Sequence, residues 1–365
     1  MITTDLLVVG SGPAGLGAAI EGARYGAHVL LVDENNKAGG QLYKQIHKFF
    51  GSGAHYAGYR GFQIADLLLR QALSLGVKIF LNTRALGRMD NGRIAILHEG
   101  AVEEVEASKV VLATGAKENA LAFPGWTLPG VMTAGAAQTF SNVHGTLVGQ
   151  NILMVGSGNV GLIVSYQLMQ AGANVQALVE AMPRITGYLV HAGKIQRAGV
   201  PIYTSHTIVE ARGVDRVEEA VIVQVDEKFK PIPSTEKTIA VDTILLAVGL
   251  NPRTELASMF HCRMTYESLL GGILPVHDQW MRSSNVDTYV CGDLAGVEEA
   301  NTALDEGRLA GLHAACSLLP EVPEEALEHM SALTESLCAL RSGSHAALRL
   351  ESKRRIMDKG GACHV

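Results

Sequence analysis

The feature that most constrains this sequence is a glycine-rich turn that occurs twice, each time after an apolar run. The first copy reads DLLVVGSGPAGLGAAI over residues 5–20, and the second reads NILMVGSGNVGLIVSY over residues 151–166. Each is followed by another apolar run, HVLLVDE at 28–34 and NVQALVE at 174–180. A strand, a tight turn, a helix and a second strand form a βαβ unit, which builds a parallel sheet. The repeat therefore predicts an α/β chain with two three-layer domains.

The first turn has the residues that a dinucleotide pyrophosphate requires. Gly10 allows a tight turn, Gly12 lets the backbone approach a phosphate without a Cβ in the way, and Gly15 lets the helix pack on the strand. Asp33 follows Gly15 by 18 residues, where a carboxylate accepts hydrogen bonds from ribose. A glycine turn of some other α/β fold is the alternative. The contacts expected from this region are Gly10, Gly12, Pro13, Ala14, Gly15, Asp33 and Glu34.

The second turn predicts a second nucleotide. Glu180 follows Gly161 by 19 residues, and a carboxylate there favours a free 2′-hydroxyl over a 2′-phosphate. NAD(H) is therefore expected rather than NADP(H), although Arg184 nearby works against this choice. The alternative is a repeat that binds nothing, or another adenine nucleotide. The expected contacts are Gly156, Gly158, Asn159, Val160, Gly161 and Glu180, with Gly249 after a later apolar run.

A third glycine motif indicates that the first dinucleotide is FAD. Gly292 and Asp293 end the run TYVCGD, which suits an aspartate that holds a ribityl hydroxyl. A helix begins around Asn301 and Thr302, and its dipole would stabilise negative charge at the N1–C2=O edge of a flavin. Asp293 as a simple helix N-cap is the alternative. Further FAD contacts are expected from the GGQ turn and from the end of VLATGA, namely Gly40, Gln41, Thr114 and Gly115.

The stretch LYKQIHKFFGSGAHYAGYRGF, residues 42–62, mixes basic and aromatic side chains. It is interpreted either as an active-site or partner-docking segment beside the flavin, or as a solvated basic loop with an aromatic anchor. Hydride transfer needs stacked rings more than an acid or base. His47 and Lys48 are the only catalytic candidates that the sequence offers.

Composition excludes several classes. A net charge of −6 disfavours nucleic acid as a partner. We also expect no signal peptide, no membrane span and a cytoplasmic location. The cysteines lack close spacing, so neither a redox dithiol nor a metal or iron–sulfur set is expected, and the terminal Cys363–His364 pair is interpreted as a frayed end. The five cysteines are Cys262, Cys291, Cys316, Cys338 and Cys363.

Together, GSGPAG, GGQ, VLATGA, GSGNVG, AVGLNP and CGD resemble the two-dinucleotide flavoprotein family that includes thioredoxin reductase, up to about Leu319. The stretch FPGWTLPGVMTAGAAQ, residues 123–138, resembles a narrower branch. That branch comprises the FAD/NAD-binding α subunits of amino-acid and opine dehydrogenases, including proline and hydroxyproline dehydrogenases, opine oxidases, hydrogen cyanide synthase and sarcosine oxidase α.

The resemblance implies FAD, NAD(H) and an oligomer with a second flavoprotein subunit that oxidises an amine or amino acid. Many members carry cysteines for a 2Fe–2S cluster near the C-terminus. The tail of this sequence lacks such a set, so a separate iron–sulfur subunit is expected.

The expected organisation is a pair of Rossmann-like dinucleotide-binding domains with inserted β-meanders, as in glutathione and thioredoxin reductases. Residues 1–122 and 256–320 would form a discontinuous FAD domain, 123–255 an inserted NAD(P) domain, and 321–365 a peripheral helical tail. The favoured function is electron transfer between NAD(H) and a partner flavoprotein subunit. A stand-alone NADH oxidoreductase that reduces quinone, dye or oxygen, and a non-catalytic nucleotide-binding flavoprotein subunit, are the alternatives.

Overall fold

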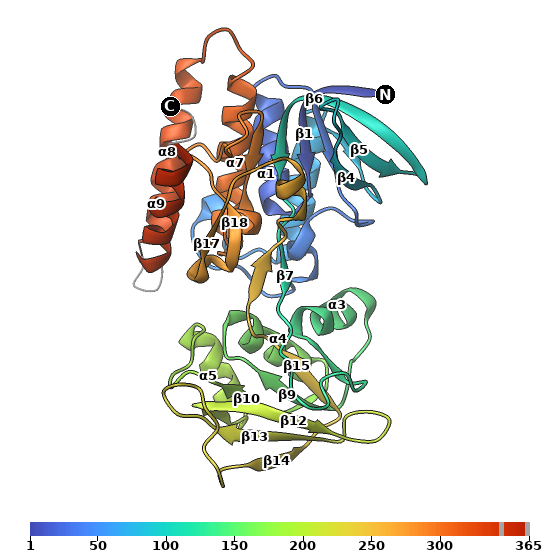
Figure 1. Ribbon diagram of the computed structural model, residues 1–365, viewed down its shortest axis with the longest axis vertical. Helices are drawn as coiled ribbons and strands as arrows, with labels where there is room; N and C mark the ends of the chain where they lie inside the picture. The colour runs from blue at the N-terminus through green and yellow to red at the C-terminus, as the bar shows by residue number, and fades with distance from the viewer. Residues whose placement is uncertain (343–346, 362–365) are drawn as a thin grey trace. The chain divides into compact units, whose positions relative to one another are not determined.

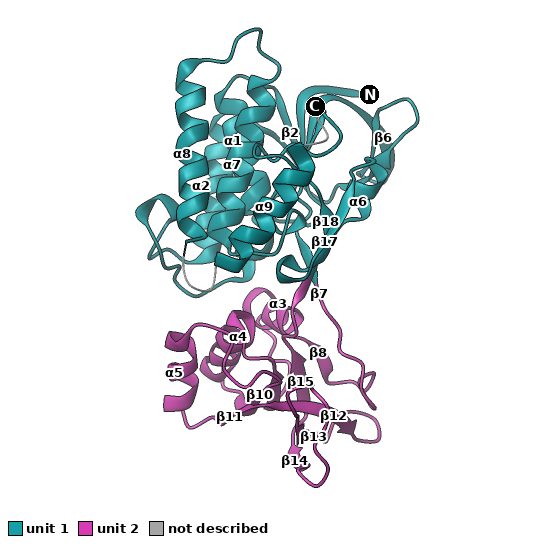
Figure 2. Cartoon of the chain, turned by 60° about the vertical axis from the view of Figure 1, so that its left-hand side comes forward, with its two compact units in different colours: residues 1–117, 251–365 teal, residues 118–250 magenta. Residues whose placement is uncertain are grey.

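The computed structural model describes residues 1–342 and 347–361, so Cys363 and His364 lie outside the described residues. The chain divides into two compact units (Figure 2), unit 1 with residues 1–117 and 251–365 and unit 2 with residues 118–250. These boundaries lie five residues before the expected ones at 122 and 255. The reason is that the chain passes between the units in two short strands that pair with each other, β7 (Ala116–Glu118) and β16 (Leu250–Pro252).

Unit 1 is built on a seven-stranded sheet with the order β3-β2-β1-β6-β5-β4, in which β19 also pairs with β6. β1, β2, β3, β6 and β19 pair in parallel, whereas β4 and β5 form an antiparallel meander with β6. The β1 side chains Leu6, Leu7 and Val8 are fully buried, as expected for a parallel strand covered on both faces. The bounds are β1 (Ile2–Val9), β2 (Val29–Val32), β3 (Lys78–Phe80), β4 (Arg84–Arg88), β5 (Ile94–His98), β6 (Ala101–Leu112) and β19 (Thr288–Val290).

Two helices of unit 1, α1 and α7, pack closely (Figure 1). A Cβ on Gly307 of α7 would lie 1.9 Å from the Ala14 carbonyl oxygen of α1, so the helix backbones touch. This contact joins the first glycine turn to a helix almost 300 residues later in the chain. The remaining elements are α1 (Pro13–Arg24), η1 (Gly40–Lys44), η2 (Gly53–His55), α2 (Gly61–Ser74), α6 (Glu255–Met259), β17 (Met264–Glu267), η3 (Ser268–Leu270), β18 (Gly272–Pro275), η4 (Gly292–Leu294), α7 (Ala300–Cys316), α8 (Glu324–Leu340) and α9 (Ala347–Gly361).

Unit 2 repeats the plan of unit 1. Its five-stranded parallel sheet has the order β11-β10-β9-β15-β8, and β12, β13 and β14 form a separate antiparallel sheet. The predicted fold class, two Rossmann-like domains with meanders, is confirmed. The bounds are β8 (Val131–Thr133), α3 (Ala134–His144), β9 (Asn151–Val155), α4 (Asn159–Gln170), β10 (Asn174–Glu180), α5 (Leu189–Arg197), β11 (Ile202–Thr204), β12 (His206–Arg212), β13 (Glu219–Gln224), β14 (Lys237–Ala240) and β15 (Thr243–Leu246).

The tail is not a peripheral appendage. The α8 side chains Ala326, Met330, Leu333 and Leu337 are buried in the core cluster of unit 1. On α9, Lys353 is completely buried. The polar composition of the tail conceals an apolar stripe at helical spacing on α8, and its buried charge needs partners that only the folded chain supplies.

Candidate dinucleotide-binding sites

The first glycine turn links β1 to α1, and two of its glycines are required by the chain itself. Gly10 has φ +102°, a left-handed conformation that favours glycine, and a Cβ there would lie 2.3 Å from the Ala113 carbonyl oxygen. A Cβ on Gly15 would lie 1.7 Å from the Gly10 carbonyl oxygen. Both positions therefore exclude a side chain, whatever the turn binds.

Gly12 is glycine for a different reason. It is the N-cap of α1 with φ −65° and ψ −177°, a conformation open to any residue. No atom of the described residues lies within 4 Å of the position of its missing Cβ, and Pro13 fills the first helical position. Space in front of a helix N-terminus fits a pyrophosphate, whose oxygens would accept the N–H groups of the first turn.

Asp33 is buried and fully engaged by its neighbours. Its Oδ2 accepts the N–H and the hydroxyl of Ser11, each at 2.6 Å, and its Oδ1 accepts the N–H and the side-chain amide of Asn35, each at 2.8 Å. A carboxylate offers about four acceptor sites. A ribose hydroxyl would therefore replace one of these four contacts. The sequence analysis missed Ser11, although a serine stands at the same place in both turns.

Arg253 connects three residues that were expected to contact FAD. Its side chain pairs with exposed Glu34 at 2.8 Å, and Arg84 lies 3.6 Å from the same carboxylate. The Arg253 carbonyl oxygen accepts the Thr114 hydroxyl at 2.9 Å, and its N–H donates to the Gly115 carbonyl oxygen at 2.9 Å. Glu34, Thr114 and Gly115 thus lie together beyond the ends of β2 and β6, and their contact with FAD stays a prediction.

The GGQ turn folds back onto the first glycine turn. Gly39 N–H donates to the Ser11 carbonyl oxygen at 2.9 Å. A Cβ on Gly40 would lie 2.7 Å from Gly12 Cα, so these two predicted residues are in contact. Gln41 is the second residue of η1, and its side chain is exposed.

The third glycine motif reaches the same place from the far end of the chain. A Cβ on Gly292 would lie 2.8 Å from the Cβ of Ala14, in the first turn of α1. Asn301 and Thr302 lie in the first turn of α7, and Thr302 is buried. Residues from the three motifs therefore meet around the N-terminus of α1.

Asp293 lies in η4 and is not the N-cap of α7, which is Glu299. Its Oδ1 accepts the Glu298 N–H at 3.5 Å. Burial raises the pKa of the Asp293 carboxyl to about 7, the Glu298 N–H lowers it, and repulsion from Glu306 raises it further. A protonated carboxyl can donate as well as accept, so Asp293 suits a polar ligand group such as a hydroxyl.

The second glycine turn, between β9 and α4, has the geometry of the first. Gly156 has φ +106° and a Cβ there would lie 2.3 Å from the Ala247 carbonyl oxygen, while one on Gly161 would lie 2.1 Å from the Gly156 carbonyl oxygen. Gly158 is the N-cap of α4 in an ordinary conformation. In the described part of the chain, only Thr186 Oγ1, at 4.0 Å, reaches the position of its missing Cβ. The space in front of α4 therefore fits a pyrophosphate as well.

Glu180 is held as Asp33 is. Its Oε2 accepts the Ser157 N–H at 2.9 Å and the Ser157 hydroxyl at 2.6 Å, and its Oε1 accepts the Met182 N–H at 2.9 Å. Gly187 N–H donates to the Ser157 carbonyl oxygen at 2.9 Å. Gly187 was missed because it stands outside any glycine motif of the sequence.

The other residues expected to contact NAD are spread along the same edge of unit 2. The Asn159 side chain accepts the Tyr188 N–H at 2.9 Å. Val160 is 39% exposed in the first turn of α4. Gly249 lies past β15, where its carbonyl oxygen accepts the Asn119 N–H at 3.0 Å.

The two catalytic candidates belong to a ribbon formed by the basic aromatic stretch. The His47 ring stacks on Phe49 with centroids 5.3 Å apart, and Lys48 makes an antiparallel bridge to Arg60. These contacts account for both residues as parts of the ribbon. A catalytic role for either stays a prediction.

A histidine that the sequence analysis did not select ties this ribbon to α7. His55 Nε2 lies 2.8 Å from Asp305 Oδ2, and its Nδ1 lies 2.9 Å from the Ser52 hydroxyl. Ser336 of α8 also donates to Asp305 Oδ2, at 2.7 Å. The ribbon is therefore anchored beside the first turns of α7, and no local pattern could have revealed a pair 250 residues apart.

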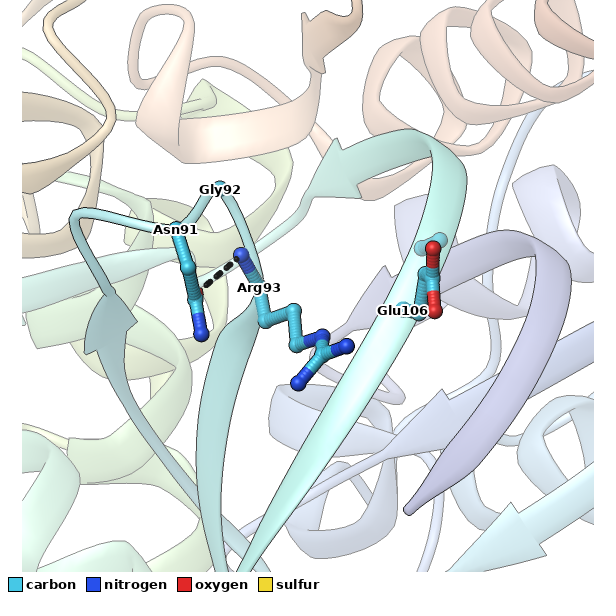
Figure 3. A pocket seen from close by; sticks show the side chains of 5 residues that line it. Asn91, Gly92, Arg93 and Glu106 are labelled. Atoms are coloured by element: carbon cyan, nitrogen blue, oxygen red, sulfur yellow. Dashed lines mark hydrogen bonds between the residues drawn. The ribbon is translucent and has the colours of Figure 1, made fainter.

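The pocket in Figure 3 lies in the meander of unit 1 and contains none of the predicted site residues. The Arg93 N–H donates to the Asn91 side chain at 3.0 Å across its rim. The lining residues are Asn91, Gly92, Arg93, Glu106 and Ala107. Separately, no helix within residues 1–342 and 347–361 has the length and apolarity needed to cross a membrane.

A parallel sheet with a glycine turn and an acid, present twice, defines the class of two-dinucleotide oxidoreductases. The chain belongs to the pyridine nucleotide-disulphide oxidoreductase family, which it matches over residues 4–307. Members of this family typically bind FAD and NAD(P). The resemblance inferred from the motifs is thereby confirmed.

Curated relatives place the chain near subunits of larger oxidases. It is 30% identical to the A subunit of opine oxidase from Agrobacterium tumefaciens strain Ach5, over 86% of this chain and 66% of that protein. It is also 30% identical to the HcnB subunit of hydrogen cyanide synthase from Pseudomonas aeruginosa PAO1, over 96% of this chain and 76% of that protein. The chain thus spans about two thirds of the length of the A subunit of opine oxidase.

Solved structures share the fold. L-proline dehydrogenase from P. horikoshii superposes with a TM-score of 0.68 and 22% identity, over 92% of this chain and 59% of that one. T. acidophilum thioredoxin reductase gives 0.69 and 20% identity, over 87% and 99%. At this identity the likeness shows the fold alone.

Proposed function

We propose that unit 1 binds FAD, that unit 2 binds NAD(H), and that the chain passes electrons between NAD(H) and a partner flavoprotein subunit that oxidises an amine or amino acid. The observation that carries this is the pair of N-cap glycines, Gly12 and Gly158. In both, the described residues leave space where a Cβ would point, and the backbone conformation does not require glycine. A ligand at each helix N-terminus explains both glycines.

When bound, FAD supplies hydride and single-electron chemistry. The chain's own residues bind and orient it. The N–H groups of α1 would hold the pyrophosphate, the Asp33 carboxylate the ribose and Asp293 the ribityl chain. The N-terminus of α7 would stabilise negative charge on the flavin. In unit 2, α4 and Glu180 would hold NAD(H) in the same manner.

In this proposal, electrons leave the chain through partner subunits and not through its own cysteines. Cys262, Cys291 and Cys316 are buried and Cys338 is exposed, and all four described cysteines are free. Burial raises the pKa of the Cys291 thiol, which makes it a poor nucleophile. A dithiol relay is therefore not proposed despite the family's name. An iron–sulfur subunit and a second flavoprotein subunit are proposed instead, in keeping with relatives named as subunits of opine oxidase and hydrogen cyanide synthase.

Rapid anaerobic mixing of the purified protein with NADH tests the nicotinamide half of this proposal. The expected result of mixing is loss of the oxidised flavin spectrum. Purification from the native source tests the partner half, and co-purification with a second flavoprotein in fixed ratio is expected there. NADH that neither binds nor reduces the flavin would overturn it.

A stand-alone NADH:acceptor oxidoreductase is the second candidate, favoured by the ribbon near α7. Phe50 and Tyr59 of this ribbon are 61% and 48% exposed, and apolar rings on a surface suit a quinone or dye. Steady turnover of NADH and a quinone by the isolated chain would favour this candidate. Turnover that appears only after a partner subunit is added would exclude it.

A further inference from the structure

Two basic side chains from the C-terminal region are buried in unit 1. Lys353 on α9 is 0% exposed and Arg341, directly after α8, is 6% exposed. Charges buried to this degree need a partner. Both pair with Glu306 of α7, which is 1% exposed. Its Oε1 accepts Lys353 Nζ at 2.6 Å and the Arg341 guanidinium at 2.5 Å.

The same lysine and glutamate hold the turn that carries the GD motif. Glu306 Oε2 accepts the Gly292 N–H at 3.0 Å. Lys353 Nζ donates to the Ala295 carbonyl oxygen at 2.9 Å. Lys353 of α9 is therefore bonded directly to the middle of this turn, at Ala295, and through the Glu306 carboxylate to its start, at Gly292.

Arg341 holds the other end of the turn. Its guanidinium donates to the Glu298 carboxylate at 2.6 Å, and the Glu298 N–H donates to Asp293 Oδ1 at 3.5 Å. Three attachment points of residues 292–298 thus lead to side chains beyond residue 340, and a fourth, the Val297 N–H, donates to the Leu270 carbonyl oxygen at 2.9 Å. The segment lies against α1 through Gly292, so its position decides where Asp293 stands relative to the first glycine turn.

We propose that Lys353 is a positioning residue of the FAD site, which fixes the Gly292–Asp293 turn through Ala295 and Glu306. The inference rests on the proposed function, in which Asp293 contacts FAD. Lys353 also neutralises Glu306 behind the turn. Its loss would leave extra negative charge near a ring that becomes anionic on reduction, which disfavours the reduced flavin.

The test uses Lys353→Met in the full-length flavoprotein, with Arg355→Met as the matched control. Arg355 lies on the same helix, but its ion pair, 2.6 Å, runs to Glu267 of β17. We expect Lys353→Met to weaken FAD binding by about tenfold or more, as for loss of a charge-assisted hydrogen bond. We also expect it to lower the midpoint potential of the flavin. Arg355→Met should change neither, even where both variants melt earlier.

Removing one partner of a buried pair can unfold a protein, so a second variant is needed. Lys353→Met/Glu306→Gln removes both charges and keeps an amide oxygen for the Gly292 N–H, while Arg341 stays paired with Glu298. It should bind FAD weakly, with a midpoint potential closer to the parent than that of Lys353→Met.

FAD affinity within about twofold of the parent in either folded variant would overturn the proposal. So would failure of both variants to fold, because the cluster would then be a general core element. A parent chain that binds no FAD would instead refute the proposed function and this role with it.

Discussion

In unit 1 the serine of the Gly-Ser-Gly turn donates to Asp33, and in unit 2 the serine at the same place donates to Glu180, each through its hydroxyl at 2.6 Å. The acids differ by one methylene, yet both are held by the serine N–H as well. The shared part of the two turns is therefore a scaffold that fastens the second strand to the glycine turn.

In both units the loop after the second strand bonds back to the glycine turn, and the two units differ in this loop. Gly39 and Gly187 each donate to the serine carbonyl oxygen at 2.9 Å. The next residue is Gly40 in unit 1, packed against Gly12, and Tyr188 in unit 2, which is 50% exposed. The scaffold is thus common to both turns, and the two units differ at the residue that follows it.

The largest expected effect separates the two N-cap glycines. Gly12→Val should abolish FAD retention and Gly158→Val should abolish reduction by NADH while FAD stays bound, because each side chain would fill the space for one pyrophosphate. Stability should fall by only about 1 kcal/mol in both, because the chain leaves room for the side chain and valine is merely a poorer N-cap than glycine. Flavin content and chemical denaturation measure this. An unchanged flavin spectrum in Gly12→Val would refute the FAD assignment.

Next in size are the serines. Ser11→Ala and Ser157→Ala should each lower the free energy of unfolding by about 2 kcal/mol, because each removes a hydrogen bond to a buried carboxylate. Ser74→Ala, an exposed serine bonded to a helix carbonyl oxygen, is the control. Unequal decreases in the free energy of unfolding, measured by urea denaturation, would show that the two serines do not stabilise their turns equally.

A smaller effect is expected at the second acid. Glu180→Gln should raise the apparent constant for NADH about tenfold, the cost of one charge-assisted hydrogen bond to ribose. FAD content should not change. Asp33→Asn is the reciprocal control and should lower FAD affinity only. Steady-state kinetics at saturating acceptor measure this, and an effect of Glu180→Gln on FAD content would contradict the separation.

The smallest effect concerns Asp293, in the third glycine motif. Its pKa, about 7, lies above the ordinary value of 3.8. As pH rises from about 4 to 7, an unfolded chain releases this proton before the folded one does, so stability falls. In nucleotide-free protein, Asp293→Asn should melt about 2–4 °C above the parent at pH 8 and equally at pH 4. The same gain at both values would exclude this titration.

The sequence predicted what depends on short-range patterns. The roles of Gly10 and Gly15 follow from the spacing of one turn, and the structure has both glycines where only glycine fits. It did not predict Ser11 or Gly187, whose bonds form only when the second strand and the following loop return to the turn. A serine at the same place in both repeats was the available signal for Ser11.

Long-range pairs were beyond local reasoning. Lys353 reads as one residue of a basic, polar tail, and its burial depends on Glu306, 47 residues earlier on another helix. His55 and Asp305 are further apart still. Charges are interpreted as exposed unless a partner is known, and the fold alone supplies these partners.

Because β7 pairs with β16, unit 2 is one continuous segment that could be removed from the chain. Arg253 N–H donates to the Gly115 carbonyl oxygen, and Asn119 N–H to that of Gly249. This antiparallel register sets Lys117 opposite Asn251, at about 5 Å between Cα atoms. The chain thus leaves unit 1 and re-enters it at adjacent points. A two-residue hairpin joining these points would delete 118–250 and leave every strand of the unit 1 sheet in its native order.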